Sequence, residues 1–159
     1  MAGRVTSSMT QVIALAVWLG AATFFAAAVA PALFAVLPSR TLAGAVVGRL
    51  LPVILYAGML IGILVTVSDG MAGGWRWRGR GGLGALIVAA CAVAQFVIGA
   101  RIARVRAQIP GAIDDLPVDD ARRVAFGRLH GLSVGWLGLA MIAGLVALVL
   151  AVRSLQSRS

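Results

Sequence analysis

Four long apolar stretches, separated by short segments that carry nearly all of the charge, constrain this sequence more than any other feature. They cover residues 11–37, 42–67, 82–100 and 131–152. A helix needs about 20 apolar residues to cross the roughly 30 Å of hydrocarbon in a bilayer, so each stretch suits a span. Each should be helical, because an unpaired backbone group in hydrocarbon costs several kcal/mol. Hydrophobic residues make up 61% of the chain, which excludes an ordinary water-soluble fold.

We therefore predict an all-α, integral membrane four-helix bundle that forms a single domain over residues 1–159. Segment 101–130 is the longest stretch outside the spans. It has no helix breaker before Pro110, and Asp119 or Asp120 can cap a new helix by accepting its first amide protons. The third and fourth helices should therefore extend beyond the bilayer.

The basic residues predict how the chain contacts and crosses the membrane. All 14 are arginines, and most lie beside the ends of spans, where they attract anionic headgroups; the net charge of +9 therefore indicates membrane lipids as partners and not nucleic acid. The segment Trp75-Arg76-Trp77-Arg78 is expected to anchor in the headgroup layer. Arginine is slightly more frequent on the side of the first and third loops than on the side of the termini. We expect a multi-pass protein of the bacterial inner membrane with loops one and three in the cytoplasm.

Small residues at helical spacing indicate where helices approach closely, because packing in lipid gains nothing from the hydrophobic effect. The spacing predicts packing surfaces within one bundle or between copies of the chain, at Gly44, Gly48, Gly58, Gly62, Gly127, Gly131 and Gly135. Pro31 and Pro52 each remove a helical hydrogen bond and should kink the first two helices.

Polar side chains near or inside the membrane are costly to bury, and a functional role is a reasonable default hypothesis for them. The candidates are Arg40, Arg49, Gln95 and His130, with Thr23, Tyr56 and Ser133 as weaker ones. They supply no recognisable metal-ligand spacing, since the chain has one histidine and one cysteine, Cys91. We expect no cofactor, and haem or copper bound through His130 is the alternative, with a haem held between two copies.

An enzyme-like pattern occurs at the start of the fourth stretch. Gly131-Leu132-Ser133-Val134-Gly135 matches G-x-S-x-G and follows His130. That nucleophile motif requires a strained turn between a strand and a helix, and no strand precedes it here. We interpret it as helix packing, and we expect no enzyme.

The sequence also resembles a known family in two places. In the first half, Leu33-Phe34 is followed by Leu37-Pro38-Ser39-Arg40, Ala43-Gly44 and Arg49-Leu50-Leu51-Pro52. In the second half, Phe126 precedes Leu129-His130-Gly131-Leu132-Ser133. Both elements resemble the family of transmembrane protein 205, a four-span family with a domain of unknown function. That family usually has Asn shortly after the Ser, where this chain has Gly135-Trp136-Leu137. The resemblance implies a four-helix membrane bundle and little about activity.

Three functional hypotheses follow. The first is a non-enzymatic membrane component associated with transport of, or resistance to, a small solute or metal, acting as a homo-oligomer or with a membrane protein partner. The second is a haem- or metal-binding membrane protein that uses His130. The third is an enzyme in which Arg49 and His130 act on a membrane-soluble substrate. The two family elements, from Arg40 to Pro52 and from Phe126 to Ser133, should lie on the same membrane face.

Overall fold

The chain forms four long helices joined by three short connections. In the computed structural model, residues 2–71 and 79–156 are described, with the side chains of 8–70 and 79–156. The Trp75–Arg78 anchor, Arg158 and the side chain of Arg4 lie outside the described residues. The elements, in order, are α1 (Ala2–Phe24), η1 (Phe25–Val29), α2 (Ala30–Val36), α3 (Arg40–Met71), α4 (Arg80–Ala92), η2 (Val93–Ile98), α5 (Gly99–Ala107), η3 (Ile113–Asp115) and α6 (Ala121–Gln156).

The described residues confirm the all-α fold and the four predicted spans. Four helices are long and apolar enough to cross a membrane, over Ser8–Val36, Arg40–Gly70, Arg80–Ala107 and Ala121–Gln156. Large apolar side chains point outward over much of the surface; Val17 is 67% exposed, Leu60 68% and Ile142 64%. Such a surface is stable in lipid and unstable in water. The protein is a multi-pass membrane protein by fold.

The third and fourth helices are long enough to project past the bilayer, as predicted. Arg80–Ala107 comprises 28 residues and α6 comprises 36, against the roughly 20 needed for a span. Asp120 caps α6, since its Oδ1 accepts the Arg122 backbone amide at 2.8 Å. The two helices are joined by residues 108–120, which include the single 3₁₀ turn η3.

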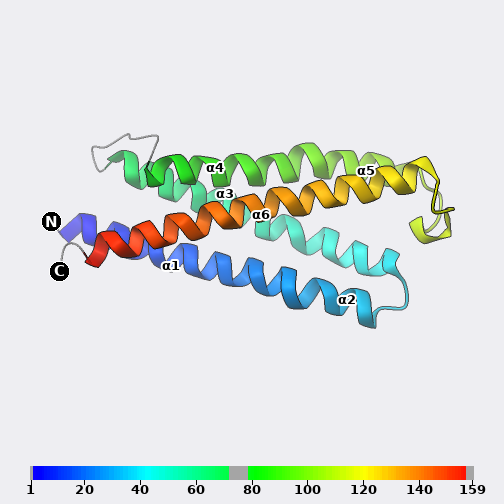
Figure 1. Ribbon diagram of the computed structural model, residues 1–159, viewed down its shortest axis with the longest axis horizontal. Coiled ribbons are helices and arrows are strands. Elements are labelled where there is room, and N and C mark those ends of the chain that lie inside the picture. The colour runs from blue at the N-terminus through cyan, green and yellow to red at the C-terminus, as the bar shows by residue number, and fades with distance from the viewer. Residues whose placement is uncertain (1, 72–78, 157–159) are drawn as a thin grey trace.

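The four helices run up and down, and both termini lie at one end of the bundle (Figure 1). Near that end α3 packs on α4, while α6 packs on both α1 and α4. Toward the opposite end α3 separates from the third membrane helix, which consists of α4, η2 and α5, and lies beside α2. In the same part of the bundle α5 stays beside α6 (Figure 1). The bundle is therefore split at this end into an α2–α3 pair and an α5–α6 pair. The first and third connections both lie there.

The buried core is in the unsplit half of the bundle and centres on Trp18 of α1. Its indole Nε1 donates a hydrogen bond to the carbonyl oxygen of Ile54 on α3, at 3.0 Å. Leu15, Leu55 and Cys91 pack in the same buried cluster. The α6 face toward the core is made largely of small residues, namely Ala140, Ala143, Gly144, Ala147 and Ala151.

Two π-helical segments widen the first and third helices. Phe25–Val29 is π-helical just before Pro31, which lies in the first turn of α2. Since proline has no amide proton to donate to the carbonyl four residues earlier, a local change of hydrogen-bond pattern is expected there. Pro52 lies inside α3, which continues through it without a break. The second segment, Val93–Ile98, contains no proline.

The glycines predicted to pack fall into two groups. A Cβ added at Gly58 would lie 2.8 Å from the Trp18 ring and from Cys91 Sγ, and one at Gly62 would lie 2.7 Å from the carbonyl oxygen of Gly84. These two positions require glycine, because α1, α3 and α4 approach too closely for a larger residue. Gly84, which faces Gly62, completes this contact and was not among the predicted glycines.

The other glycines make no such contact within one chain. A Cβ at Gly48, Gly127, Gly131 or Gly135 would meet nothing within 4 Å, and one at Gly44 would meet only Arg106 Nη1, at 3.8 Å. Of the two predicted alternatives, packing within the bundle has no close contact at these four open positions. The face of α6 that turns inward carries alanines in place of the glycine row. Pairing of the row with a second copy stays a prediction.

Candidate functional site

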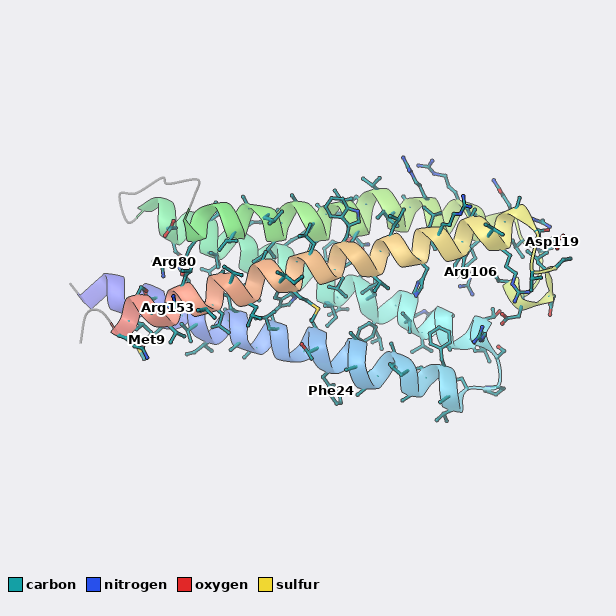
Figure 2. The ribbon with its side chains drawn as sticks, in the orientation of Figure 1. Met9, Phe24, Arg80, Arg106, Asp119 and Arg153 are labelled. Atoms are coloured by element: carbon teal, nitrogen blue, oxygen red, sulfur yellow. The ribbon has the colours of Figure 1, made fainter. Side chains whose placement is uncertain are left out.

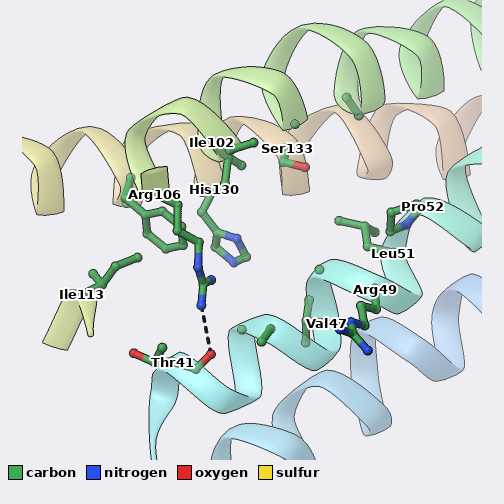
Figure 3. Close-up of a pocket in the computed structure, with 18 of the residues that line it drawn as sticks. Thr41, Val47, Arg49, Leu51, Pro52, Ile102, Arg106, Ile113, His130 and Ser133 are labelled. Atoms are coloured by element: carbon green, nitrogen blue, oxygen red, sulfur yellow. Dashed lines mark hydrogen bonds between the residues drawn. The ribbon is translucent and has the colours of Figure 1, made fainter. Parts of the chain in front are cut away.

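A cavity of about 1060 Å³ lies between the α2–α3 pair and the α5–α6 pair, at the split end of the bundle. Figure 3 shows Arg106 and His130 pointing from α5 and α6 toward the first turns of α3. Most of the wall is apolar, with Phe34, Leu51, Pro52, Phe96 and Phe126 among its side chains. The short η3 turn contributes Ile113 and Asp114 to the same wall. The cavity thus lies where the two helix pairs splay apart.

The structure brings all four members of the predicted polar cluster to this one cavity. Arg40 and Arg49 line it from α3, and His130 and Ser133 line it from α6. Gln95, which sequence reasoning also singled out, lines it from the π-helical segment η2. Thr23 and Tyr56 are not among the lining residues. The two family-like elements meet here because the first and third connections share one end of the bundle.

His130 and Ser133 are one helical turn apart on α6. The His130 ring is stacked on Phe126, with centroids 6.3 Å apart and an interplanar angle of 6°. Ser133 is 5% exposed. No hydrogen bond among the described residues joins either side chain to a carboxylate, and the guanidinium of Arg49 points away from the His130 ring in Figure 3. The arrangement offers polar groups on an apolar wall and no nucleophile paired with a base.

Arg49 and Gln95 lie on parts of their helices where the backbone pattern is altered. Pro52 follows Arg49 by three residues and cannot donate to the carbonyl of Gly48, which also lines the cavity. Across the cavity, the amide of Gly99 donates to the carbonyl of Ala94, a π-type bond that places Gln95 and Phe96 on the wall. Such single π-helical turns occur frequently at functional sites.

Among the described residues, a hydrogen bond between Arg106 and Thr41 links α5 to α3 at the mouth of the cavity, which is its end at the first turn of α3. Arg106 Nη2 donates to the carbonyl oxygen of Thr41 at 3.4 Å, which joins α5 to the first turn of α3 (Figure 3). Both residues line the cavity, and sequence reasoning singled out neither as a site residue. The sequence does not distinguish Arg106 from the neighbouring arginines Arg101 and Arg104, because its contact with Thr41 depends on how α5 is rotated about its axis.

Positive charge dominates the cavity. Arg40, Arg49, Arg106 and Arg123 line it, and Asp114 is the only carboxylate among the lining residues. The guanidinium of Arg123 donates to the carbonyl oxygen of Leu116 at 2.6 Å, which holds the connection between α5 and α6 in place.

The ion pairs of the described residues lie outside the cavity. Arg80 and Asp69 are 3.6 Å apart at the end that holds the termini, where Arg80 and Arg153 lie (Figure 2). Arg122 and Asp120 are 2.8 Å apart at the start of α6. Hydrogen bonds from Arg122 lower the pKa of Asp120 from 3.8 to about 2. The lining arginines therefore have no carboxylate partner in the part of the chain that the structure describes.

No group of three or more His, Cys, Asp or Glu side chains gathers as a metal site within residues 2–71 and 79–156. His130 is thus the one histidine of the chain available to a cofactor in the cavity.

Comparison with known proteins identifies the family but no activity. Residues 13–110 match the family described as a domain of unknown function, DUF4149. No curated protein and no solved structure matches the chain. The matched residues run from the first helix to the end of the third and include the α3 and α5 walls of the cavity. Because the match covers more than half of the chain, this protein belongs to the DUF4149 family.

Proposed function

We propose that this protein is a non-enzymatic, transport-associated membrane component that binds a small amphipathic solute in the cavity between the α2–α3 and α5–α6 pairs. The observation that carries the proposal is the cavity itself, with about 1060 Å³ of space, a largely apolar wall and a cluster of polar side chains. Ligand sites typically have such volumes and such a mixture of apolar wall and few polar groups. The same residues offer no nucleophile with its base, which makes binding a better-supported function than catalysis.

The position of the cavity along the bundle axis favours a bound molecule that is polar at one end and apolar at the other. Arg80 and Arg153 both lie at the end that holds the termini, and we take them as the level of one membrane boundary (Figure 2). A hydrocarbon slab of about 30 Å corresponds to about 20 helical residues, so it would end near Ala100 and Ser133. The cavity would then straddle the headgroup layer and the outer hydrocarbon. A molecule that enters from the bilayer would meet apolar and charged walls together.

The test uses a matched pair of tryptophan substitutions on α3. Ala45 lines the cavity and is exposed, so Ala45→Trp should fill it. Val46 is the next residue, is also exposed and does not line the cavity, so Val46→Trp is the control. We expect native mass spectrometry of detergent-purified protein to detect a retained lipid-like molecule in the wild type and in Val46→Trp, and to detect none in Ala45→Trp. Equal retention in all three proteins would reject the cavity as the binding site.

Haem binding through His130 is a second candidate function for the same cavity, and the position of the imidazole on its wall favours it. A porphyrin needs only one or two axial ligands from protein, so a single histidine in each of two copies is sufficient. The test is absorbance in the Soret region after haem is added to the purified protein, with His130→Ala as the comparison. A haem spectrum that is the same in both proteins would exclude His130 as the ligand.

We also propose that, within the DUF4149 family, this chain belongs to the family of transmembrane protein 205. Support comes from the two sequence elements that carry the resemblance, since Phe34, Arg40, Arg49, Phe126 and His130 all belong to them and all line the cavity. The DUF4149 match ends at residue 110, before the second element. Alignment of the transmembrane protein 205 family over residues 111–137 is the test, and a pattern without His-Gly-Leu-Ser there would contradict the proposal.

For the orientation, we propose a bacterial inner membrane protein whose cavity end faces the cytoplasm. The support is the small excess of arginine on the side of the first and third loops. Val118 lies in the third connection and is 77% exposed, and Gly70 is exposed at the opposite end. A membrane-impermeant thiol reagent on intact cells should label Gly70→Cys and leave Val118→Cys unlabelled, each in a Cys91→Ala background. The reverse pattern would invert the orientation.

A further inference from the structure

The cavity wall carries more positive charge than a site for an amphipathic molecule of any charge requires. Of the described arginines, those in ion pairs are Arg80 and Arg122, and neither lines the cavity. The cavity has four arginines and one carboxylate, Asp114. Charges that lie at a low-dielectric wall without a partner attract an ion of opposite sign more strongly than charges in water do. An anionic group is therefore the complement of this wall.

Arg106 presents most of its hydrogen-bonding capacity to the cavity. A guanidinium has five N–H donors in a fixed plane, and within the described residues the guanidinium of Arg106 makes one hydrogen bond, the long contact of 3.4 Å to the Thr41 carbonyl oxygen. Its side chain is half-buried and reaches across from α5 to α3. Gly44 lies beside the guanidinium, since a Cβ there would be 3.8 Å from Arg106 Nη1, an ordinary van der Waals contact. The guanidinium is thus held at the mouth and free to bind an oxyanion.

The hydroxyl of Thr41 is a second donor on a residue that lines the cavity. Thr41 Oγ1 is buried and has no hydrogen-bond partner. A buried hydroxyl left without a partner is costly, so it is expected to bind something that the protein alone does not provide. Thr41 lies beside Arg40 at the start of α3 and accepts the Arg106 contact through its own carbonyl. A guanidinium and an orphaned hydroxyl therefore belong to two residues that line the same cavity.

We infer that the occupant of the cavity is an anionic phospholipid, with its phosphate at Arg106, Arg40 and the Thr41 hydroxyl and an acyl chain along the apolar wall. Arginine suits phosphate because its planar fork matches two phosphate oxygens. Leu51, Pro52 and Leu55 of α3 extend the wall away from the mouth, over roughly 20 Å of helix from Arg40, which an acyl chain can follow. This inference rests on the proposed function and names the class of solute.

The experiment measures retention of three probes by native mass spectrometry. The probes are phosphatidylglycerol, phosphatidylcholine with the same acyl chains, and inorganic phosphate added as a competitor. We expect phosphatidylglycerol to be retained about tenfold more strongly than phosphatidylcholine, in line with the strength of hydrogen bonds to charged groups. Millimolar inorganic phosphate should leave the lipid bound, since it cannot use the apolar wall. Displacement by inorganic phosphate alone would overturn the assignment and identify a free anion as the ligand.

Matched variants connect this preference to the mouth of the cavity. Arg106→Gln should reduce the preference for phosphatidylglycerol about tenfold, because it removes the charge and most of the donors. Arg101→Gln is the control, since Arg101 is an exposed arginine on the same helix that does not line the cavity. Thr41→Val keeps the shape of the side chain and removes only its hydroxyl, so it tests the same point if Arg106→Gln does not fold.

The outcomes separate this inference from the proposed function. If phosphatidylglycerol and phosphatidylcholine are retained equally, and neither Arg106→Gln nor Thr41→Val changes the ratio, phosphate recognition is rejected while lipid binding in the cavity stands. If no lipid is retained, or if Ala45→Trp retains as much lipid as the wild type, the cavity is not the site. In that case both proposals fail.

Discussion

The indole of Trp18 donates a hydrogen bond of 3.0 Å to the carbonyl oxygen of Ile54, and this bond joins the first and second membrane helices at the centre of the core. Trp18 is 2% exposed and also contacts the positions of Gly58 and Gly144. One side chain thus connects α1 with α3 and α6. It holds together the half of the bundle that is not split by the cavity.

Replacement of Trp18 by Phe should therefore destabilise the protein by about 1–2 kcal/mol. A hydrogen bond between membrane helices contributes about 0.6 kcal/mol on average, and the smaller ring leaves a void in a packed core. Unfolding by denaturing detergent, followed by circular dichroism, measures the change. Tyr56→Phe is the control, because Tyr56 is exposed and lies outside the buried core cluster. A Trp18→Phe protein as stable as this control would contradict the role given to Trp18.

Gly58 should not tolerate a side chain. A Cβ there would lie 2.8 Å from both the Trp18 ring and Cys91 Sγ, so Gly58→Ala must push α1 or α4 away from α3. Overpacking of this kind costs about 1–3 kcal/mol. At Gly48 on the same helix nothing lies within 4 Å, and Gly48→Ala should leave stability unchanged or raise it by up to about 1 kcal/mol. The same unfolding measurement compares the pair, and equal effects at the two positions would argue against the close approach of α1, α3 and α4.

A side chain added in the exposed glycine row of α6 (Gly127, Gly131 and Gly135) should not destabilise the monomer, in contrast to one added at Gly58. Gly131 is exposed, and a Cβ there meets nothing within 4 Å, so Gly131→Leu should leave the thermal unfolding midpoint of the monomer unchanged. Its effect should appear only in self-association, measured by chemical cross-linking in membranes, because small residues let helices of two copies approach. Loss of monomer stability would show that the row packs within the bundle after all. Unchanged cross-linking would show that the row is a lipid-facing surface.

Much of this architecture could be predicted from the sequence because lipid leaves few alternatives. Apolar stretches of sufficient length must be helices in a membrane, and four of them place the first and third connections on one face. Arg40, Arg49, His130 and Ser133 lie near those connections, so their presence around one cavity follows from topology and depth alone. The sequence also predicted a helix cap at Asp119 or Asp120, and Asp120 is the residue whose carboxylate accepts the amide proton.

What could not be predicted depends on how each helix is rotated about its axis. Gly131 and Ala143 are both small residues on α6, yet Ala143 faces the core and Gly131 faces outward. Small size is compatible with either position, so the glycine spacing could not distinguish them. The Arg106–Thr41 link depends in the same way on the rotation of α5 and on the splay of the two helix pairs. Nothing in the sequence around Val93–Ile98 announces a π-helical turn, because the segment has neither proline nor glycine.

The cap of α6 should make stability depend on pH in a narrow acid window. Hydrogen bonds from Arg122 lower the pKa of Asp120 to about 2 in the folded protein, below its ordinary value of 3.8. A carboxyl whose pKa is lower when folded stabilises the fold above pH 4, and this contribution declines as the pH falls below about 4 and is lost below about 2. Asp120→Asn keeps a good capping residue but removes the charge, so it should melt at a lower temperature than the wild type at pH 7, and the difference should shrink towards pH 2 and vanish below it. Asp119→Asn, at the exposed neighbouring carboxylate, is the control. A difference between wild type and Asp120→Asn that stays constant from pH 7 to pH 2 would show that the ion pair with Arg122 does not stabilise the start of α6.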